Sequence, residues 1–346
     1  MRRGRSLAVD LSILAVIGVL LFAALAAGAG ALYREFYSPS AFVLRYLSML
    51  EAGRAADALA MPGVKLDGTQ LTNAGLPQSA SDALLRSAAL GDLDDASIIG
   101  EEQDGETTIV RARYNAGGHH ATTSFRVASD GTIGVAPAWR FAQSPLAVMK
   151  LTVAGSMTFD VNSFSLDKRQ VSPDGVDADP LAPVSMLVFS PGLYSISVDT
   201  AIAKTAGMAV LADAPMVNVP VDLQAEPTEE FIDVVQQRVE EFLTGCTSQQ
   251  VLQPTGCPFG FVVRNRVEEL PTWTITQQPA VTVVADGAGW RIPDTGASAH
   301  IDLQVRSLFD GALYKVSEDV PFVVNGTIDV LPDGTASIRL GDSDLD

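Results

Sequence analysis

Basic residues, cysteine and histidine are scarce in this sequence, and the shortage of basic residues excludes one class of partner. Lysine and arginine together number 23 among 346 residues, against 41 aspartates and glutamates, and the formal net charge is −18. A surface this negative repels polyanions, because binding to phosphates depends on cationic side chains. We therefore expect no nucleic-acid partner and a solvated acidic surface.

Recognisable catalytic motifs are also missing. The chain has no Gly-rich phosphate loop, no G-x-S-x-G nucleophile elbow and no H-E-x-x-H metal motif. Asp294, Thr295 and Gly296 spell the tripeptide of aspartic proteases, but those enzymes need two carboxylates that share a proton, and no second copy exists. We read this tripeptide as a turn between strands, and we read Asn325-Gly326-Thr327 as a hairpin turn rather than a glycan site. We expect no catalytic residue, no resident metal and no cofactor, and hence a protein that is not an enzyme.

The N-terminal region contains a long uncharged run, residues 11–32. As a helix, these 22 residues would span about 33 Å, enough for a bilayer core. Arg2, Arg3 and Arg5 precede the run, so the positive-inside rule leaves the N-terminus in the cytoplasm and exports the rest. The sequence thus predicts a single-pass plasma-membrane protein with the lipid bilayer as a partner. The alternative is a signal peptide cleaved near Ala31, although such apolar regions are usually shorter.

The two cysteines, Cys246 and Cys257, both lie in the part predicted to be exported. An oxidising compartment permits a disulfide between them. Zinc is a poor alternative, because two thiolates without a nearby histidine fill only half of a tetrahedral shell. We expect a disulfide, with free thiols as the alternative.

The rest of the chain divides into three predicted domains at residues 38–146, 147–223 and 224–346, after a stub and anchor at 1–37. The first starts with a helix that Ser38 caps and Pro39 opens. A short second helical piece is expected over 54–61 and a further helix over 79–90, followed by strands that alternate with a period of two. Helices followed by antiparallel strands indicate an α+β class.

The second and third predicted domains differ in their patterns. Residues 147–223 consist of strand-like runs split by Pro, Gly and Asp, with no helix expected. In 224–346 an amphipathic helix turns Phe231, Val235, Val239 and Phe242 inward, and strands follow. The acidic tail GDSDLD (341–346) is expected to fray.

Two stretches resemble known families. SPSAFVLRYLSMLEAGRAADALAMPG (38–63) resembles the opening of nuclear-transport-factor-2-like (cystatin-like) domains, and VFSPGLYSISVD (188–199) resembles the P-G-x-Y hairpin of PEGA-type surface modules. Together with the anchor, the arrangement resembles exported envelope proteins of the teicoplanin-resistance-associated type in Gram-positive bacteria, and the composition resembles that of actinobacteria. The resemblance implies two cystatin-like domains that flank a PEGA-like module. Unlike that family, this sequence contains no cytoplasmic zinc ribbon. The resemblance therefore implies no function that requires a zinc ribbon.

A few polar or aromatic residues are candidates for a site. His300 and Asp302 alternate on one strand face, where such a pair could orient a general base in a cone-shaped pocket, and Trp290 is a further candidate for that pocket. Cross-strand polarity explains the pair equally well. His119 and His120 follow Gly117-Gly118 at a predicted hairpin tip, and adjacent strand residues point to opposite faces, which is awkward for joint metal binding.

An acidic loop is the remaining candidate for ligand binding. Asp174, Asp177 and Asp179 cluster in it, and outside a cell such a cluster could hold calcium. Their spacing does not match an EF-hand, so a solvated turn is favoured. The sequence as a whole predicts a non-catalytic binding, scaffolding or sensing role in the cell envelope, with cell-wall or envelope proteins as possible partners. The alternative is a small-ligand carrier or enzyme that uses a cone-shaped pocket.

Overall fold

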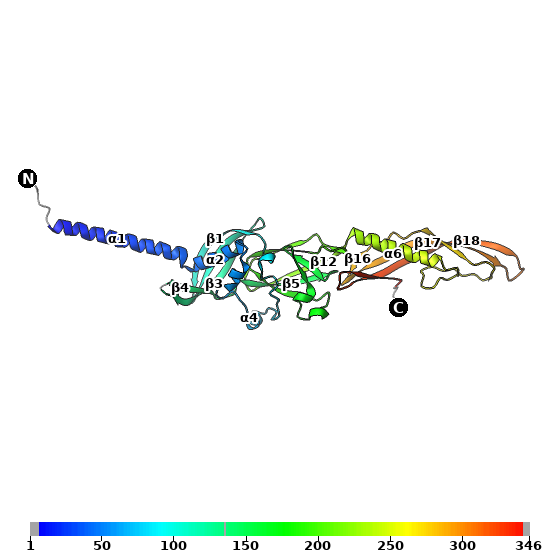
Figure 1. Cartoon of the computed structure of the whole chain (residues 1–346), viewed down its shortest axis with the longest axis horizontal. Helices are drawn as coiled ribbons and strands as arrows, with labels where there is room; N and C mark the ends of the chain where they lie inside the picture. Colours follow the sequence, from blue (N-terminus) through cyan, green and yellow to red (C-terminus); the bar gives the residue numbers. More distant parts are fainter. Residues whose placement is uncertain (1–6, 135, 342–346) are drawn as a thin grey trace, which may run out of the picture. The chain divides into compact units, whose positions relative to one another are not determined.

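The computed structural model describes residues 7–134 and 136–341 (Figure 1). The chain forms two compact units. Unit 1 takes the described residues up to 149 together with 186–194 and 210–219, and unit 2 takes 150–185, 195–209 and the described residues from 220 onward. The middle of the chain thus contributes to both units, and the predicted division into three consecutive domains stays a prediction.

The N-terminal helix α1 covers Leu7–Phe36. Within the described part of the chain, no helix combines the length and the apolar character that crossing a membrane requires. The transmembrane helix predicted over 11–32 is therefore wrong as a statement about the fold. The prediction rested on the length of the uncharged run, which is not by itself a measure of its apolar character. Arg2, Arg3 and Arg5 and the tail at 342–346 lie outside the described residues.

The first helices of unit 1 only partly follow the prediction. The Ser38 side chain accepts a hydrogen bond from the backbone N–H of Ala41 at the start of α2, which confirms the predicted cap. The helix predicted over 79–90 is wrong. There Ser81 forms a parallel bridge with Met186, so pairing with a distant strand outweighs the local helical pattern. The helices of this region are α2 Pro39–Glu51, α3 Ala55–Ala60, α4 Gly68–Asn73 and the 3₁₀ helix η1 Ser87–Ala89.

A four-stranded antiparallel meander packs against α2. Its strands, in spatial order, are β1 Leu93–Asp104, β2 Thr107–Ala116, β3 His119–Ile133 and β4 Ala136–Phe141. The predicted hairpin tip between β2 and β3 is confirmed: Gly117 and Gly118 both have positive φ angles, 55° and 85°, which favour glycine. His119 and His120 follow this turn and pair with Ala116 and Asn115.

Aromatic side chains fill the space between α2 and the meander. The rings of Phe42 and Tyr46 on α2 meet those of Phe125 and Phe141 on the sheet, at centroid separations of 4.9 to 5.9 Å. All four residues are buried. Aromatic pairs at such tilted geometries add to the stabilisation that their burial provides. The inner face of this sheet is therefore packed core.

Two buried tyrosines of unit 1 differ in how their hydroxyl groups are bonded. The Tyr194 hydroxyl donates to the carbonyl oxygen of Phe189 at 3.0 Å. Among the described residues, the Tyr114 hydroxyl has no hydrogen-bond partner. Burial, helped by the charge of Asp213, raises the pKa of Tyr114 to about 12. A buried hydroxyl without a partner costs stability, because it has lost its hydrogen bonds to water.

This difference predicts opposite effects for two matched substitutions. Tyr114→Phe should leave the free energy of unfolding unchanged or raise it by up to about 1 kcal/mol, whereas Tyr194→Phe should lower it by about 1–2 kcal/mol. The folded-state pKa of Tyr114 lies above the unfolded value of 10.0. Titration of Tyr114 therefore leaves the free energy of unfolding unchanged below pH 10 and lowers it as the pH rises from 10 to 12. Tyr114→Phe should remove that alkaline loss. Urea unfolding at pH 8 and pH 11 measures both effects, and an equal loss in the two variants would refute the assignment.

Short strands and two short helical turns make up the middle of the chain. The sheet orders are β11-β9-β6-β7 and β12-β5-β8, and β10 pairs with β13. The elements are β5 Leu146–Ala154, β6 Thr158–Val161, β7 Phe164–Asp167, α5 Lys168–Val171, η2 Gly175–Asp177, β8 Val184–Phe189, β9 Gly192–Ser197, β10 Ala203–Lys204, β11 Met208–Ala212, β12 Asn218–Gln224 and β13 Glu226–Pro227.

The hairpin predicted from VFSPGLYSISVD is wrong. Strands β8 and β9, on either side of Ser190-Pro191, belong to different sheets. The turn residues were identified correctly, but they carry the chain from one sheet into the other. The expectation that this region has no helix is also wrong, since α5 forms where the Asp167 carboxylate accepts a hydrogen bond from the backbone N–H of Arg169.

The last part of unit 2 is a long helix packed on a sheet built around one long hairpin. Helix α6 spans Glu229–Thr247 and begins at a Thr228 cap. Of the residues predicted to face inward, Phe231, Val235 and Val239 are confirmed as buried. Phe242 is not, and its neighbour Leu243 is buried instead. The strands are β14 Arg266–Val267, β15 Thr272–Gln277, β16 Val284–Asp286, β17 Gly289–Arg306, β18 Leu313–Val330 and β19 Ala336–Leu340. Strand β17 pairs with β14, β15, β16 and β18, and β19 pairs with β18.

Two predicted turns lie inside these strands. Asp294, Thr295 and Gly296 belong to β17, next to a register shift between Ile292 and Thr295. Asn325 belongs to β18, and its amide donates to the Asp294 carboxylate at 2.9 Å. A side chain at Gly326 would collide with the carbonyl oxygen of Arg339 on β19, so this glycine permits close strand approach. The turn interpretations of both segments are wrong.

Strand accounts for 44% of the structure and helix for 22%, so the chain is mixed α/β and mostly strand. The predicted α+β class, with a transmembrane helix and two cystatin-like domains flanking an all-β module, is therefore wrong. The prediction assumed several short strands separated by turns in the last third of the chain. In the structure β17 and β18 are 18 residues each, because pairing along the hairpin outweighs the local turn signals.

Candidate functional site

A groove of about 700 Å³ lies on unit 1, between α2–α3 and the β3–β4 segment. Its apolar walls come from Phe42 and Met49 on α2, and from Trp139 on β4. Ile133, at the end of β3, is 79% exposed beside it. The full lining is Phe36, Tyr37, Ser38, Phe42, Arg45, Met49, Arg54, Asp57, Ala60, Met61, Pro62, Asp130, Ile133, Ala136, Pro137, Ala138 and Trp139.

Hydrogen bonds fix one wall of the groove. The indole N–H of Trp139 donates to the backbone carbonyl oxygen of Tyr37 at 2.9 Å, which orients its ring. Ser38, which also lines the groove, uses its side-chain oxygen to cap α2. This hydroxyl therefore already has a structural role, and it lies beside no histidine in the lining.

Each charged group of the groove has a partner. Asp130 Oδ1 lies 3.8 Å from Arg140 Nε, which is outside the lining. Arg54 Nε lies 2.7 Å from Asp57 Oδ2, and both side chains are more than half exposed. An Arg45 nitrogen donates to the carbonyl oxygen of Phe36 at 3.5 Å. Catalytic sites instead bring a nucleophile, a base and an oxyanion donor toward one point. The geometry suits an apolar segment held between polar edges.

The structure brings His300 and Asp302 together in a polar cluster on the β17–β18 hairpin. His300 Nδ1 lies 2.7 Å from Asp319 Oδ1, and its Nε2 lies 3.0 Å from Ser317 Oγ and 3.6 Å from Asp302 Oδ2. Lys315 Nζ lies 2.8 Å from Asp302 Oδ1. Hydrogen bonds from Lys315 and Ser317, followed by the charges of Lys315 and His300, lower the pKa of Asp302.

This cluster is partly exposed, and it does not belong to the groove of unit 1. Its polar side chains contact one another across the two strands, as cross-strand polar pairs commonly do. A pocket role for His300 and Asp302 stays a prediction, and the contacts of these two side chains do not support it. The cluster's role in fixing the register of the hairpin is the simpler physical account.

Trp290 lies away from these two residues and inside the core of unit 2. It is buried, its ring centroid lies 5.4 Å from that of Phe231 on α6, and its indole N–H donates to the carbonyl oxygen of Ala225 at 3.2 Å. The packing and the hydrogen bond account for this residue as a core anchor.

A buried lysine braces the acidic loop of Asp174, Asp177 and Asp179. The Lys168 ammonium donates to the carbonyl oxygens of Pro180 and, at 3.5 Å, of Asp179. Burial lowers the pKa of Lys168, and the nearby charge of Asp179 partly opposes that effect. Within residues 7–134 and 136–341, no group of three or more His, Cys, Asp or Glu residues is arranged to hold a metal ion.

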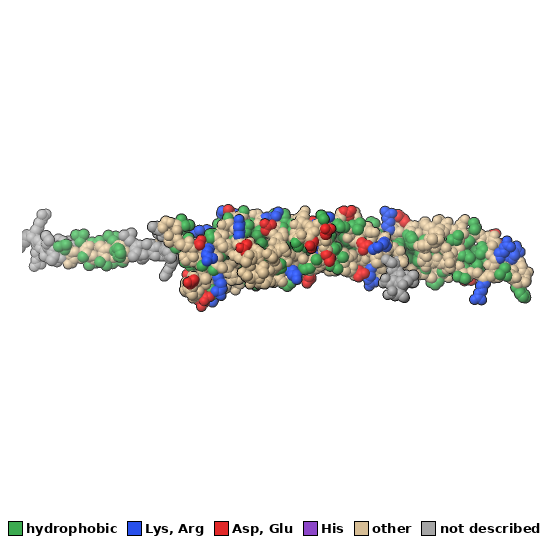
Figure 2. All heavy atoms as spheres, turned by 90° about the horizontal axis from the view of Figure 1, so that it is seen from below, with side chains coloured by type: hydrophobic (Ala, Val, Ile, Leu, Met, Phe, Trp, Pro, Cys, Tyr) green, Lys and Arg blue, Asp and Glu red, His purple; other side chains and the backbone are tan. Residues whose placement is uncertain are grey.

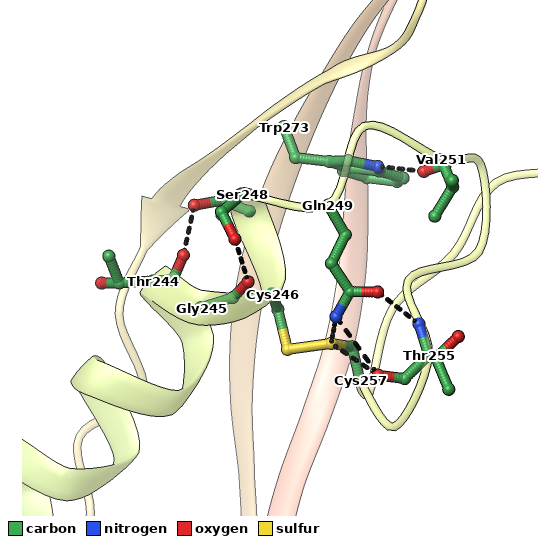
Figure 3. Close-up of a disulfide and its surroundings, with 10 residues drawn as sticks. Thr244, Gly245, Cys246, Ser248, Gln249, Val251, Thr255, Cys257 and Trp273 are labelled. Carbon is green, nitrogen blue, oxygen red and sulfur yellow. Dashed lines mark hydrogen bonds between the residues drawn. A yellow bond between two sulfur atoms is a disulfide. The ribbon is translucent and has the colours of Figure 1, made fainter.

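Cys246 and Cys257 form the predicted disulfide (Figure 3). It ties the last turn of α6 to the loop that follows. Gln249 supports the same loop, since its side-chain oxygen accepts a hydrogen bond from the Thr255 N–H at 2.9 Å. The Trp273 indole N–H donates to the carbonyl oxygen of Val251 at 2.8 Å. The loop is therefore fixed at several points.

The sequence interpretation missed the groove of unit 1. One local signal was present: apolar and small residues surround the end of β3 and the start of β4, where a solvent-exposed turn is usually polar. The opposite wall comes from α2 and α3, about 80 residues earlier, and no sequence pattern links the two.

Comparisons with protein-family models, curated proteins and solved structures found no match to this chain. The resemblance to teicoplanin-resistance-associated envelope proteins therefore stays a prediction.

Proposed function

We propose that this chain is a non-catalytic binding protein of the bacterial cell envelope and that its folded units work outside the cytoplasm. The observation that carries the proposal is the disulfide between Cys246 and Cys257. Structural disulfides persist in oxidising compartments and are rare where glutathione and thioredoxin keep thiols reduced. The acidic net charge suits a soluble surface that does not bind polyanions.

The groove of unit 1 is the proposed binding site. Its apolar walls and its charged edges fit an extended apolar segment of another envelope protein, with polar flanks that meet Arg54 and Asp57. Such sites use mainly apolar walls, and a few polar groups set orientation. The pairing of charges along the groove, rather than toward one point, supports a binding role without chemistry.

The alternative was a small-ligand carrier or enzyme with a pocket between helix and sheet. That function needs open space on the inner face of the sheet. In unit 1 the rings of Phe42, Tyr46, Phe125 and Phe141 occupy this space, which favours the binding role.

Crosslinking in intact cells tests the proposed site. A photoreactive amino acid replaces Ile133, which lines the groove, and in a matched strain it replaces Ile99, an exposed isoleucine of β1 that is absent from the lining. We expect a discrete crosslinked product from position 133 and none from position 99.

A groove substitution provides the second arm of this experiment. Once the crosslinked protein is identified, Ile133→Asp without the photoreactive residue should weaken its binding to the purified chain by about tenfold or more, since an apolar contact is replaced by a carboxylate. Ile99→Asp should leave it unchanged. Equal crosslinking at the two positions, or no product at position 133, would contradict the proposed site.

A further inference from the structure

The turn between β17 and β18 exposes large apolar side chains. Phe309 is 99% exposed and Leu308 is 73% exposed, and Leu313 and Tyr314, just past the turn, are also exposed. We define the hairpin tip as residues 305–315 with the adjacent segment 262–268, which contributes the exposed Val262. An exposed group of this size in a water-facing turn needs a partner to be favourable.

The hairpin tip also carries an unusual charge for this protein. Arg264, Arg266, Arg306 and Lys315 are its basic residues, against the acidic Glu268 and Asp310, so its formal net charge is +2. The whole chain has a net charge of −18, which leaves −20 for the remainder. Figure 2 shows basic and apolar side chains together at the right-hand end, where Figure 1 places this turn. Positive charge is thus concentrated where the apolar side chains are exposed.

Hydrogen bonds hold the hairpin tip in a defined shape. The Asn265 amide donates to the Tyr314 hydroxyl, and its oxygen accepts from the Leu308 N–H at 3.4 Å. Arg306 donates to the Gly311 carbonyl oxygen at 3.1 Å, and its Nε donates to Glu268 at 2.8 Å. The apolar side chains therefore project from a braced turn.

A lipid surface fits this chemistry better than a protein partner does. Protein hot spots centre on side chains that enter a pocket within a broad, complementary surface, and a narrow turn offers little surrounding area. A bilayer interface accepts a narrow apolar wedge, while flanking arginine and lysine side chains extend toward anionic headgroups. The aromatic Tyr314 has the apolar ring and polar tip that suit this interface.

We propose that the hairpin tip binds an anionic lipid surface by inserting Leu308 and Phe309 into the interface, while its basic residues face the headgroups. This site lies within unit 2. The proposal does not depend on what occupies the groove of unit 1. It adds lipid as a partner of a protein whose remaining surface is acidic.

Fluorescence of the full-length chain tests the proposal at one position, after subtraction of the wild-type emission, because the chain has three tryptophans of its own. In the Phe309→Trp variant, vesicles of phosphatidylglycerol and phosphatidylcholine should shift tryptophan emission to the blue, and brominated phosphatidylcholine in them should quench it. Vesicles of phosphatidylcholine alone should act more weakly. The matched control is Val176→Trp, another exposed apolar position of unit 2, which should show neither change even if the chain attaches to the vesicles elsewhere.

A second substitution measures the contribution of insertion. Adding Leu308→Asp to the Phe309→Trp variant should raise the lipid concentration for half-maximal quenching by about tenfold or more, because burial of one leucine is lost. Unchanged emission at position 309 with both vesicle types, or equal changes at positions 176 and 309, would overturn the proposal. A blue shift that grows with protein concentration without lipid would overturn it in favour of a second copy of the chain.

Discussion

Phe141→Ala should lower the free energy of unfolding of unit 1 by about 3–5 kcal/mol. Phe141 is 2% exposed, and its ring meets three others, those of Phe42, Tyr46 and Phe125. Removing it leaves a cavity at the junction of α2 and the meander, which the surrounding rings cannot close without leaving their own contacts. Urea unfolding followed by near-ultraviolet circular dichroism measures the loss.

The matched control is Phe309→Ala, the same chemical change at a residue that is almost fully exposed. It should alter the unfolding free energy by no more than about 0.5 kcal/mol. If Phe141→Ala were as mild as the control, the space between α2 and the sheet would not be packed core. The cone-pocket alternative would then return.

Removal of the disulfide should lower the unfolding free energy of unit 2 by about 3 kcal/mol. The bond closes a short loop between Cys246 and Cys257, whose sequence separation is 11, and it restricts the unfolded chain. The Cys246→Ala/Cys257→Ala double variant should match the reduced wild-type protein, and reductant should not affect the variant further. Urea titrations with and without reductant give these differences.

A small effect would contradict this account of the loop. If the double variant lost less than about 1 kcal/mol, the hydrogen bonds of Gln249 and the packing around Trp273 would hold the loop without the covalent bond. The Cys-to-Ala change also removes a small buried side chain, that of Cys246. Reduction of the wild-type protein breaks the disulfide without that change and so measures the effect of the bond alone.

Local chemistry made part of the fold predictable. The cap at Ser38, the amphipathic face of α6, the glycine turn before His119 and the disulfide each depend on residues close in the sequence, and each is confirmed. The helix over 79–90 was predicted wrongly because the bridge from Ser81 to Met186 joins segments about 100 residues apart. No local periodicity encodes that pairing.

The long hairpin explains other errors. Asp294 and Asn325 are residue types common in turns, yet they lie within β17 and β18, at the register shift between the two strands, and are joined by a hydrogen bond. Turn residues are tolerated inside strands when pairing on both sides continues. The same hairpin register brings Asp319 and Ser317 to His300, whereas strand alternation alone could identify only Asp302.

The redox state of Cys246 and Cys257 in living cells tests the central claim most directly. Acid quenching of growing cells, followed by alkylation with a maleimide of high mass, reports free thiols as a shift on a gel. An exported protein with a structural disulfide should take up no maleimide before reduction and two maleimides per chain after it. Two maleimides per chain without reduction would show that the cysteines lie in a reducing compartment and would contradict the proposed envelope role.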